Sequence, residues 1–475
     1  MTKLFPKFDE SKAFQIQISG IQEIPQNYIQ PYSPKLKIYL DKHGFKPSYI
    51  EMISSNSHNS SHNEERKKEE ENKEETHFLH NTKGVQIITY QNDLNYKIVM
   101  KRTCFGMKKK LNTEKAQDLL KNEQIVRHII VLAKEFWFYQ ITSTHNSGII
   151  AYDFSSTYLN QQNVLVNELI TEYGGKELAK LYDFGYHKMD NFKYFQQIVN
   201  MMTYFQINKI AHCDMKRENL LLDTETDSIK LIDYDISISQ DINAPYSCNS
   251  IKKINGFSHG YVSPEVLYFY CNLVLHKNTN YKNNFSINPW KNDVYSCAII
   301  ALILTGGIKS KDELAELDGC KNNCQIHDEK IKQFIKESKW NNSKLKYDED
   351  LTQKMQLIIE VCLNYNPEQR FDFLALNEIL RKIKEKNITC EEIQKICKSQ
   401  MDLKENFVDL NYVSHFLFDP TQENIITPFK EETIKINYQF SEKLISENNH
   451  EKISAILESE CNAKINSLED LIEHL

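Results

Sequence analysis

Residues 212–235 contain the pattern that most restricts what this chain can fold into. A polar stretch, His-Cys-Asp-Met-Lys-Arg-Glu-Asn over residues 212–219, leads directly into three leucines. A second apolar run, Ile-Lys-Leu-Ile over residues 229–232, ends in Asp233, a tyrosine and a second aspartate. The two apolar runs are short and joined by a polar turn, as in a hairpin. The pattern therefore predicts a polar loop, two short strands, and an acidic group where the second strand ends.

The side chains of this pattern are those that phosphoryl transfer needs. Such a reaction requires a group that orients the attacking hydroxyl, cations that neutralise phosphate charge, and oxygen ligands for a metal ion. Asp214, Lys216 and Asn219 in the loop, together with Asp233 after the second strand, supply these groups. A lone Asp-x-Lys-x-x-Asn spacing is weak, but the downstream aspartate makes the combination strong.

The chain upstream of this pattern is rich in strand signals, and the chain downstream is rich in helix signals. Residues 113–143 have helical spacing, and from Glu177 onward apolar residues recur every three or four positions. We therefore expect an α+β chain of two lobes that meet near residues 172–175. The predicted strands, which carry β-branched and aromatic residues, are residues 85–90, 96–101, 148–154 and 163–171.

Further segments resemble motifs of the eukaryotic Ser/Thr protein kinase family, and they occur in that family's order. Residues 260–265 resemble the Ala-Pro-Glu end of the activation segment, and Ser258 stands where the family has a hydroxyl that bridges the catalytic Asp and Lys. Residues 293–296 resemble the start of the buried central helix, whose aspartate anchors the catalytic loop. Residues 366–371 resemble the segment whose arginine pairs with Glu265. The resemblance implies a two-lobed protein kinase fold over residues 78–388.

Upstream residues resemble the nucleotide-binding part of the same family. Lys101 ends a run that resembles the strand presenting the phosphate-holding lysine, and Glu135 is the expected carboxylate partner, with Glu123 as the alternative. Residues 171–175 resemble the hinge that meets adenine. The resemblance implies ATP and Mg²⁺ as cofactors and proteins as substrates. It implies catalytic roles for Asp214, Lys216, Lys101 and Glu135, nucleotide contacts from Gly84, Val99, Lys101, Glu172, Gly174, Asn219 and Asp233, and metal ligands in Asn219 and Asp233.

Several residues depart from the family pattern and keep a second interpretation open. Only Gly84 stands where a glycine-rich loop should cover the phosphates, and Val99 replaces a smaller alanine. Asp235 replaces a glycine, and Cys213 replaces the arginine that receives an activation-loop phosphate. We therefore keep a catalytically silent scaffold beside the active kinase. A small-molecule kinase of the choline or aminoglycoside type is disfavoured, because such enzymes lack counterparts of residues 263–265 and 366–371.

The rest of the chain constrains function less. The net charge of −7 gives no reason to expect nucleic acid, and without a signal sequence or a run long enough to cross a bilayer we expect a cytoplasmic protein with reduced cysteines. Cys320, Cys324 and His327 are only a weak zinc pattern. The predicted divisions are an N-terminal extension (1–53), a disordered charged linker (54–77), the kinase domain (lobes 78–171 and 172–388) and a helical C-terminal extension (389–475) that offers a surface for a protein partner.

Overall fold

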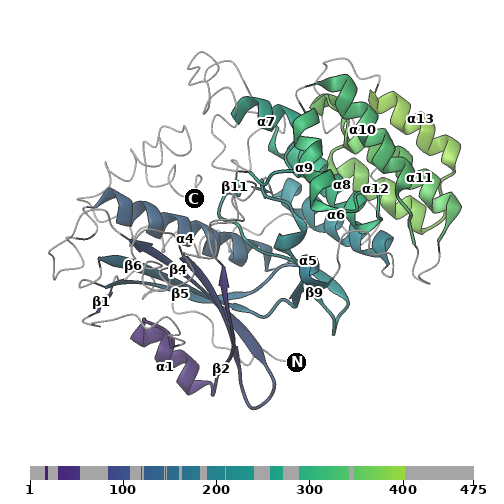
Figure 1. The fold of residues 1–475 in the computed structure, drawn as a ribbon. Helices are drawn as coiled ribbons and strands as arrows, with labels where there is room; N and C mark the ends of the chain where they lie inside the picture. Colours follow the sequence, from purple (N-terminus) through teal and green to yellow (C-terminus); the bar gives the residue numbers. More distant parts are fainter. Residues whose placement is uncertain are drawn as a thin grey trace, which may run out of the picture.

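A strand-rich lobe is followed by a helical lobe, as the sequence predicts (Figure 1). In the computed structural model, α4 (Glu123–Thr142) is the long helix of the first lobe, and the helices that follow β6 belong to the second lobe. The predicted α+β order is therefore confirmed. The structure describes residues 17–19, 30–53, 84–106, 119, 122–143, 145, 147–159, 163–181, 190–208, 210–239, 257–270, 288–321, 323–341 and 347–401.

The first lobe is built on one six-stranded sheet. The spatial order is β1-β5-β6-β4-β3-β2, and every pairing is antiparallel except that of β1 with β5. Four strands match the predicted ones, although β4 runs further and β5 starts later than expected. The strands are β1 (Gln17–Ser19), β2 (Lys46–Ile53), β3 (Gly84–Gln91), β4 (Lys97–Gly106), β5 (Ala151–Leu159) and β6 (Val164–Glu172).

Helices cover both faces of this sheet (Figure 1). On one face lies α4, whose Phe136 ring is 4.9 Å from that of Phe154 on β5. On the other face lies α1 (Pro34–Lys42), which buries Leu36 and Leu40 against apolar side chains of β3, β4 and β6. Successive side chains of a strand point to opposite faces. One set of alternate residues on β4, including Ile98 and Met100, therefore packs under α1. The other set, including Lys101, faces α4 and the second lobe.

The N-terminal extension contributes to the sheet. Strand β2 pairs along its length with β3, for example Ile50 with Ile88. The predicted boundary at residue 78 thus separates two neighbouring strands. The predicted linker at residues 54–77 connects these strands and lies outside the described residues.

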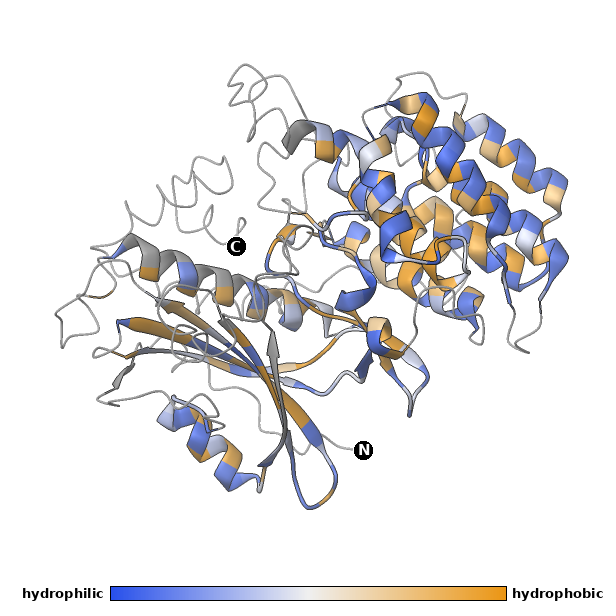
Figure 2. Cartoon of the chain, viewed as in Figure 1, coloured by the Kyte–Doolittle hydropathy of each residue, from blue (hydrophilic) through white to orange (hydrophobic). Residues whose placement is uncertain are grey.

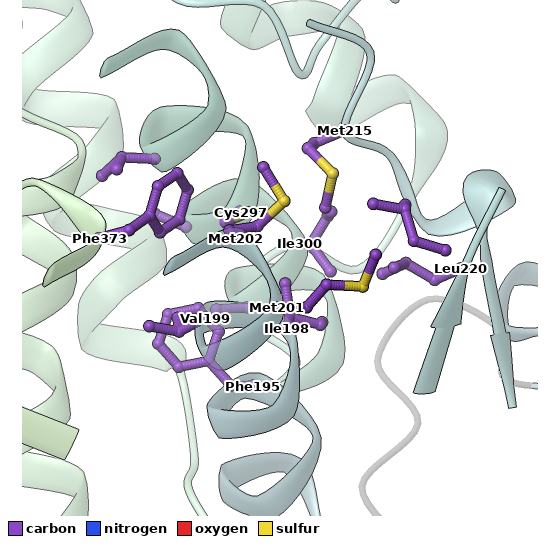
Figure 3. Packing of buried hydrophobic residues seen from close by; sticks show 14 of the residues in the cluster. Phe195, Ile198, Val199, Met201, Met202, Met215, Leu220, Cys297, Ile300 and Phe373 are labelled. Carbon is purple, nitrogen blue, oxygen red and sulfur yellow. The ribbon is translucent and has the colours of Figure 1, made fainter. Parts of the chain in front are cut away.

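The second lobe packs around α8 (Pro289–Leu304), which is apolar on all sides and buried almost throughout. The α6 side chains Phe195, Ile198 and Met202 meet Cys297 and Ile300 of α8 in this core (Figure 3). Apolar residues gather where these helices face one another, and polar ones lie on the outside (Figure 2). The other helices are α5 (Leu178–Leu181), α6 (Asn191–Ile207), α7 (Pro264–Tyr270), α9 (Lys311–Cys320), α10 (Cys324–Glu337), α11 (Glu349–Cys362), α12 (Phe373–Lys384) and α13 (Cys390–Met401), with 3₁₀ turns η4 (Arg217–Asn219) and η7 (Pro367–Gln369).

Short strands join the lobes. Three of these strands form a sheet in the order β10-β9-β7, and β11 pairs with β8. The predicted hairpin after the polar loop is formed by β9 and β10. Leu220 pairs with Leu231 at one end of the hairpin, and Asp223 pairs with Ser228 at the other. The bounds are β7 (Lys176–Glu177), β8 (Ile210–Ala211), β9 (Leu220–Asp223), β10 (Ser228–Leu231) and β11 (Ile238–Ser239).

The C-terminal extension begins inside the helical lobe. Helix α13 buries Ile393 and Cys397, and the Gln400 side chain donates to the Arg370 carbonyl at 2.9 Å. The other predicted helices of this extension lie outside the described residues. No helix in the described part of the chain is long and apolar enough to cross a membrane.

A buried ion pair fastens the segment before α1 to the sheet. The Arg102 Nε of β4 donates to the Glu168 carboxylate of β6 at 2.8 Å, and each side chain is only 1% exposed. Glu168 also accepts the backbone N–H groups of Tyr32 and Ser33, both at 3.1 Å. Arg102 in turn donates to the Gln30 carbonyl and lies over the Tyr32 ring. One acidic side chain therefore connects two strands to the N-terminal segment.

Replacing Glu168 should destabilise the first lobe. Removing one partner of a buried ion pair leaves the other charge without compensation, so we expect Glu168→Ala to lower the free energy of unfolding by about 3–5 kcal/mol. Urea unfolding followed by tryptophan fluorescence measures this change. The matched control is Asp93→Ala, which removes an exposed carboxylate 4.0 Å from Lys46 and should leave stability unchanged. Equal stabilities of the two variants would contradict the prediction.

Candidate active site

The polar loop after β8 is held by the central helix of the second lobe. The buried Asp293 carboxylate on α8 accepts the backbone N–H groups of His212 at 2.7 Å and Cys213 at 2.9 Å. Cys213 has a φ of +66°, a conformation that needs such support in a residue other than glycine. Burial raises the pKa of Asp293 to about 7, and the two N–H donors oppose this rise. The predicted anchoring aspartate thus sets the course of the loop.

The loop brings four predicted polar side chains into mutual contact. The Lys216 ammonium is 2.6 Å from one oxygen of Asp214, and the Ser258 hydroxyl donates to the other at 2.6 Å. Lys216 also donates to the Ser258 oxygen at 3.2 Å. The Asn219 amide donates to the Asp214 backbone carbonyl at 2.9 Å and to its carboxylate at 3.2 Å. Asp214 is thereby oriented from both sides and remains partly open to solvent.

An aromatic stack fixes the backbone beneath this group. The buried Tyr234 ring lies 5.4 Å from His212 and 4.8 Å from Tyr139 of α4. The Tyr234 hydroxyl is 3.2 Å from that of Thr142, also on α4. Burial lowers the pKa of His212, and its Nε2 contacts the Ile232 carbonyl at 3.2 Å. These contacts agree with a packing role for His212 and Tyr139.

Lys101 on β4 connects both lobes through three carboxylates. Its ammonium lies 2.7 Å from Glu135 on α4, 3.0 Å from Asp233 and 3.3 Å from Asp235. Of the two candidate partners for Lys101, the structure brings Glu135 to it, and the side chain of Glu123 lies outside the described residues. Glu135 has 3% of its side chain exposed, whereas Asp233 has 34% and Asp235 31%. The two aspartates are thus the accessible members of the cluster.

The cluster holds an excess of negative charge. Burial alone would lower the pKa of Lys101, but Asp233, Asp235 and Glu135 outweigh it and raise that pKa well above its usual value. Burial raises the pKa of Glu135 to about 8, against the attraction of Lys101 and with the help of both aspartates. One cation therefore faces more acidic groups than it can neutralise.

Asp235 is the residue of the cluster that sequence reasoning missed. It was noted only as a replacement for glycine, and its contact with Lys101 depends on the turn that follows Asp233. Asp233 itself has a φ of +70°, and its N–H donates to the Tyr139 hydroxyl at 3.3 Å. In the sequence, the only signal for this contact was that Asp235 is a second acidic residue two positions after Asp233.

The described residues contain one group of three side chains suited to a metal ion, namely Glu135, Asp233 and Asp235. The weak zinc pattern is not assembled into such a group. His327 is buried with its Nε2 2.9 Å from the Tyr295 hydroxyl, and Cys324 contacts Asp328. All the cysteines that the structure describes are free.

The predicted nucleotide-contacting residues lie on the inner strands β3 and β4 and on the connection between the lobes. Val99 is opposite Thr171 and shares the Lys101 side of β4. A Cβ on Gly174 would come within 2.6 Å of the Ile149 side chain and 2.9 Å of the Leu221 side chain, so a larger residue there would have to displace the ends of these two side chains. The Glu172 carboxylate accepts the Ile150 N–H at 3.0 Å. Gly84 is the first residue of β3, opposite Cys104.

The segment that resembles Ala-Pro-Glu is tied to the helical core. Both terminal guanidinium nitrogens of the buried Arg370 donate to the Glu265 carboxylate, at 2.7 and 2.8 Å. The adjacent Ser263 donates its N–H and its hydroxyl to Asn292 on α8. This places the end of the segment that carries Ser258 at a fixed distance from the polar loop.

Comparison with known proteins agrees with this geometry. A family profile described as "Protein kinase domain" matches residues 96–382, more than half of the chain. The chain is 26% identical over 209 residues to the probable serine/threonine-protein kinase HSL1 of Saccharomyces cerevisiae, covering 41% of this chain and 11% of that protein. It is 28% identical over 121 residues to CBL-interacting protein kinase 15 of Oryza sativa subsp. japonica, covering 24% and 22%. The alignment with CBL-interacting serine/threonine-protein kinase 12 of Arabidopsis thaliana, 26% identical over 192 residues, covers 39% and 31%. The chain thus spans less than a third of each of these relatives.

The raised pKa of Glu135 predicts a pH dependence of stability in the metal-free protein. Glu135 in the folded state keeps its proton up to a pKa of about 8, whereas the unfolded chain releases it above the usual pKa of 4.5. Protonated Glu135 therefore adds to the free energy of unfolding in full below pH 4.5, and this stabilisation is lost as the pH rises to about 8. Glu135→Gln cannot ionise and should flatten that part of the profile. Melting temperatures measured with a chelator across this range test the effect. Because Asp293 contributes a slope of the same sign, the difference between wild type and variant is the informative quantity, and parallel profiles would disprove the assignment.

Proposed function

Since the chain belongs to the protein kinase domain family, we propose that it transfers the γ-phosphate of ATP to serine or threonine residues of protein substrates. The observation that carries the proposal is the contact group of Asp214, Lys216, Ser258 and Asn219, held beside the pair of Lys101 and Glu135. Positioning and charge neutralisation are the main demands of phosphoryl transfer, and these groups can meet them.

In this proposal each polar side chain of the loop has one role. Asp214, partly exposed and held by Ser258 and Lys216, accepts a hydrogen bond from the acceptor hydroxyl and orients it. Lys216, which carries its charge beside Asp214, neutralises the γ-phosphate. Lys101, positioned by Glu135, contacts the α- and β-phosphates. The choice of serine or threonine as acceptor rests on Lys216 through family resemblance.

The residues present fit a magnesium ion. Mg²⁺ prefers hard oxygen ligands, and Asp233 and Asn219 offer a carboxylate and an amide oxygen. The Asp233 side chain is about one third exposed, and the Asn219 amide nitrogen is engaged by Asp214, which directs its oxygen away from that residue. Bound there, the ion would neutralise charge on the phosphates. The hinge residues Glu172 and Gly174, with Val99 and Gly84, would complete the nucleotide contacts.

We also propose that activity does not require phosphorylation of the activation segment. Cys213 stands where the family has the arginine that pairs with such a phosphate, and its thiol side chain offers no positive charge for that pairing. The contacts of Ser258 and of the Arg370–Glu265 pair support an ordered end of the segment without a phosphate.

A catalytically silent scaffold is the second candidate. It is favoured by three carboxylates already bound to the one ammonium that should receive phosphate, and by a lone glycine, Gly84, in the phosphate-covering region. Such a scaffold would use the helical lobe and the residues after 389 to bind a protein partner. Residues 402–475 lie outside the described part of the chain.

Replacing Asp214 should separate transfer from binding. We expect Asp214→Asn to abolish incorporation of phosphate from labelled ATP into a generic protein substrate and into the chain itself. Nucleotide binding, measured as a rise in melting temperature with Mg²⁺ and ATP, should be retained because Asp214 does not face Lys101.

Glu329→Gln on the exposed face of α10 is the control and should retain both activities. Wild-type protein that is stabilised by Mg²⁺ and ATP but transfers no phosphate would refute the kinase activity and favour the scaffold. Unchanged transfer by Asp214→Asn would refute the assigned role of this residue.

A further inference from the structure

We infer that Asp235 raises the concentration of divalent cation that the site needs before it accepts a nucleoside triphosphate. The inference rests on the proposed function and concerns how its nucleotide site is regulated. It starts from one contact, the 3.3 Å ion pair between the Asp235 carboxylate and the Lys101 ammonium.

All the donor capacity of Lys101 is directed at protein carboxylates. A lysine ammonium has three N–H donors. In the described structure it lies within hydrogen-bond distance of three acids, at 2.7 Å from Glu135, 3.0 Å from Asp233 and 3.3 Å from Asp235. A phosphate oxygen can therefore reach Lys101 only by replacing one of them.

Asp235 is the member that an incoming phosphate would displace. Glu135 is almost fully buried and makes the shortest contact, so it stays with Lys101. Asp233 has a role as metal ligand in the proposed function. Asp235 makes the longest of the three contacts and has 31% of its side chain exposed. Asp235 is thus accessible, and its contact with Lys101 is the weakest of the three.

The backbone prevents Asp235 from moving far from the site once displaced. The preceding Tyr234 is fully buried in the aromatic stack, and Ser237 donates its N–H to the Tyr234 carbonyl at 3.1 Å. The Ser237 hydroxyl also donates to the His212 carbonyl at 3.1 Å. A turn fixed at both ends keeps the displaced carboxylate near the phosphates.

The consequence is an unfavourable charge that a cation must offset. Like charges a few ångströms apart repel strongly at a partly buried site. The oxygens of Glu135, Asp233 and Asp235 already lie within 4.8 Å of one another. A triphosphate brings further negative charge. Its binding therefore requires additional divalent cation besides the metal ion that is bound to the nucleotide itself. Asparagine at position 235 keeps the shape and removes the charge.

The test compares wild type, Asp235→Asn and Asp235→Gly by the anisotropy of a fluorescent ATP analogue. Free Mg²⁺ is raised over a range in which the analogue is already metal-bound. At the lowest Mg²⁺ concentrations we expect both variants to bind the ATP analogue about tenfold more tightly than wild type. A difference of this size is what one neighbouring charge produces. The three affinities should converge as Mg²⁺ increases. Glu225→Gln, in the exposed turn between β9 and β10, is the matched control and should follow wild type.

A second readout uses Mg²⁺ alone. Without nucleotide, Mg²⁺ should raise the melting temperature of wild type more than that of Asp235→Asn, because the variant has less negative charge to neutralise. Affinities with the same Mg²⁺ dependence in wild type and both variants would overturn the inference and leave the proposed function intact. If no variant bound nucleotide at any Mg²⁺ concentration, the proposed function would fail, and the inference with it.

Discussion

The hydrogen bonds from the backbone of His212 and Cys213 to the buried Asp293 carboxylate determine the rest of the site. Helix α8 is the most thoroughly buried of the helices that the structure describes, so a carboxylate on it is held in a fixed position. Trp290, one turn earlier on the same helix, adds a bond of 2.6 Å from its ring nitrogen to the Ile210 carbonyl. The position of the polar loop is therefore set by α8, and with it the positions of Asp214 and Asn219. Without these bonds to Asp293, nothing would offset the cost of holding Cys213 at positive φ.

The charged cluster around Lys101 is the point at which the two lobes depend on each other. Lys101 comes from the sheet, Glu135 from α4, and the two aspartates from the turn after β10. The aromatic contacts of Tyr139 and Tyr234 run in parallel with these ion pairs and join the same elements. A shift of α4 would therefore disturb the apolar stack and the ion pairs together. The position of this helix controls both the electrostatics and the shape of the site.

The extent to which the sequence predicts this structure follows from how local each signal is. The hairpin β9–β10 and the loop before it could be predicted because their residues are contiguous and their apolar runs are short and distinct. The pairing of Lys101 with Glu135 was predicted from family resemblance, with Glu123 as the alternative. Strand β2 and helix α1 were missed, since β2 is recognised only through its pairing with β3 across a long connection. The contact of Asp235 with Lys101 was missed because it depends on a turn whose course is set by the burial of Tyr234.

The position of α1 and β2 also affects how the first lobe can be handled in isolation. Together they cover Ile88, Met100 and Ile170 on the outer face of the sheet and pair the free side of β3. A recombinant chain that began at the predicted domain boundary would leave an apolar sheet face in water and an unpaired β3 edge. Such edges are templates for association with other chains. Residues 34–53, which form α1 and β2, therefore shield both the apolar face of the sheet and the edge of β3.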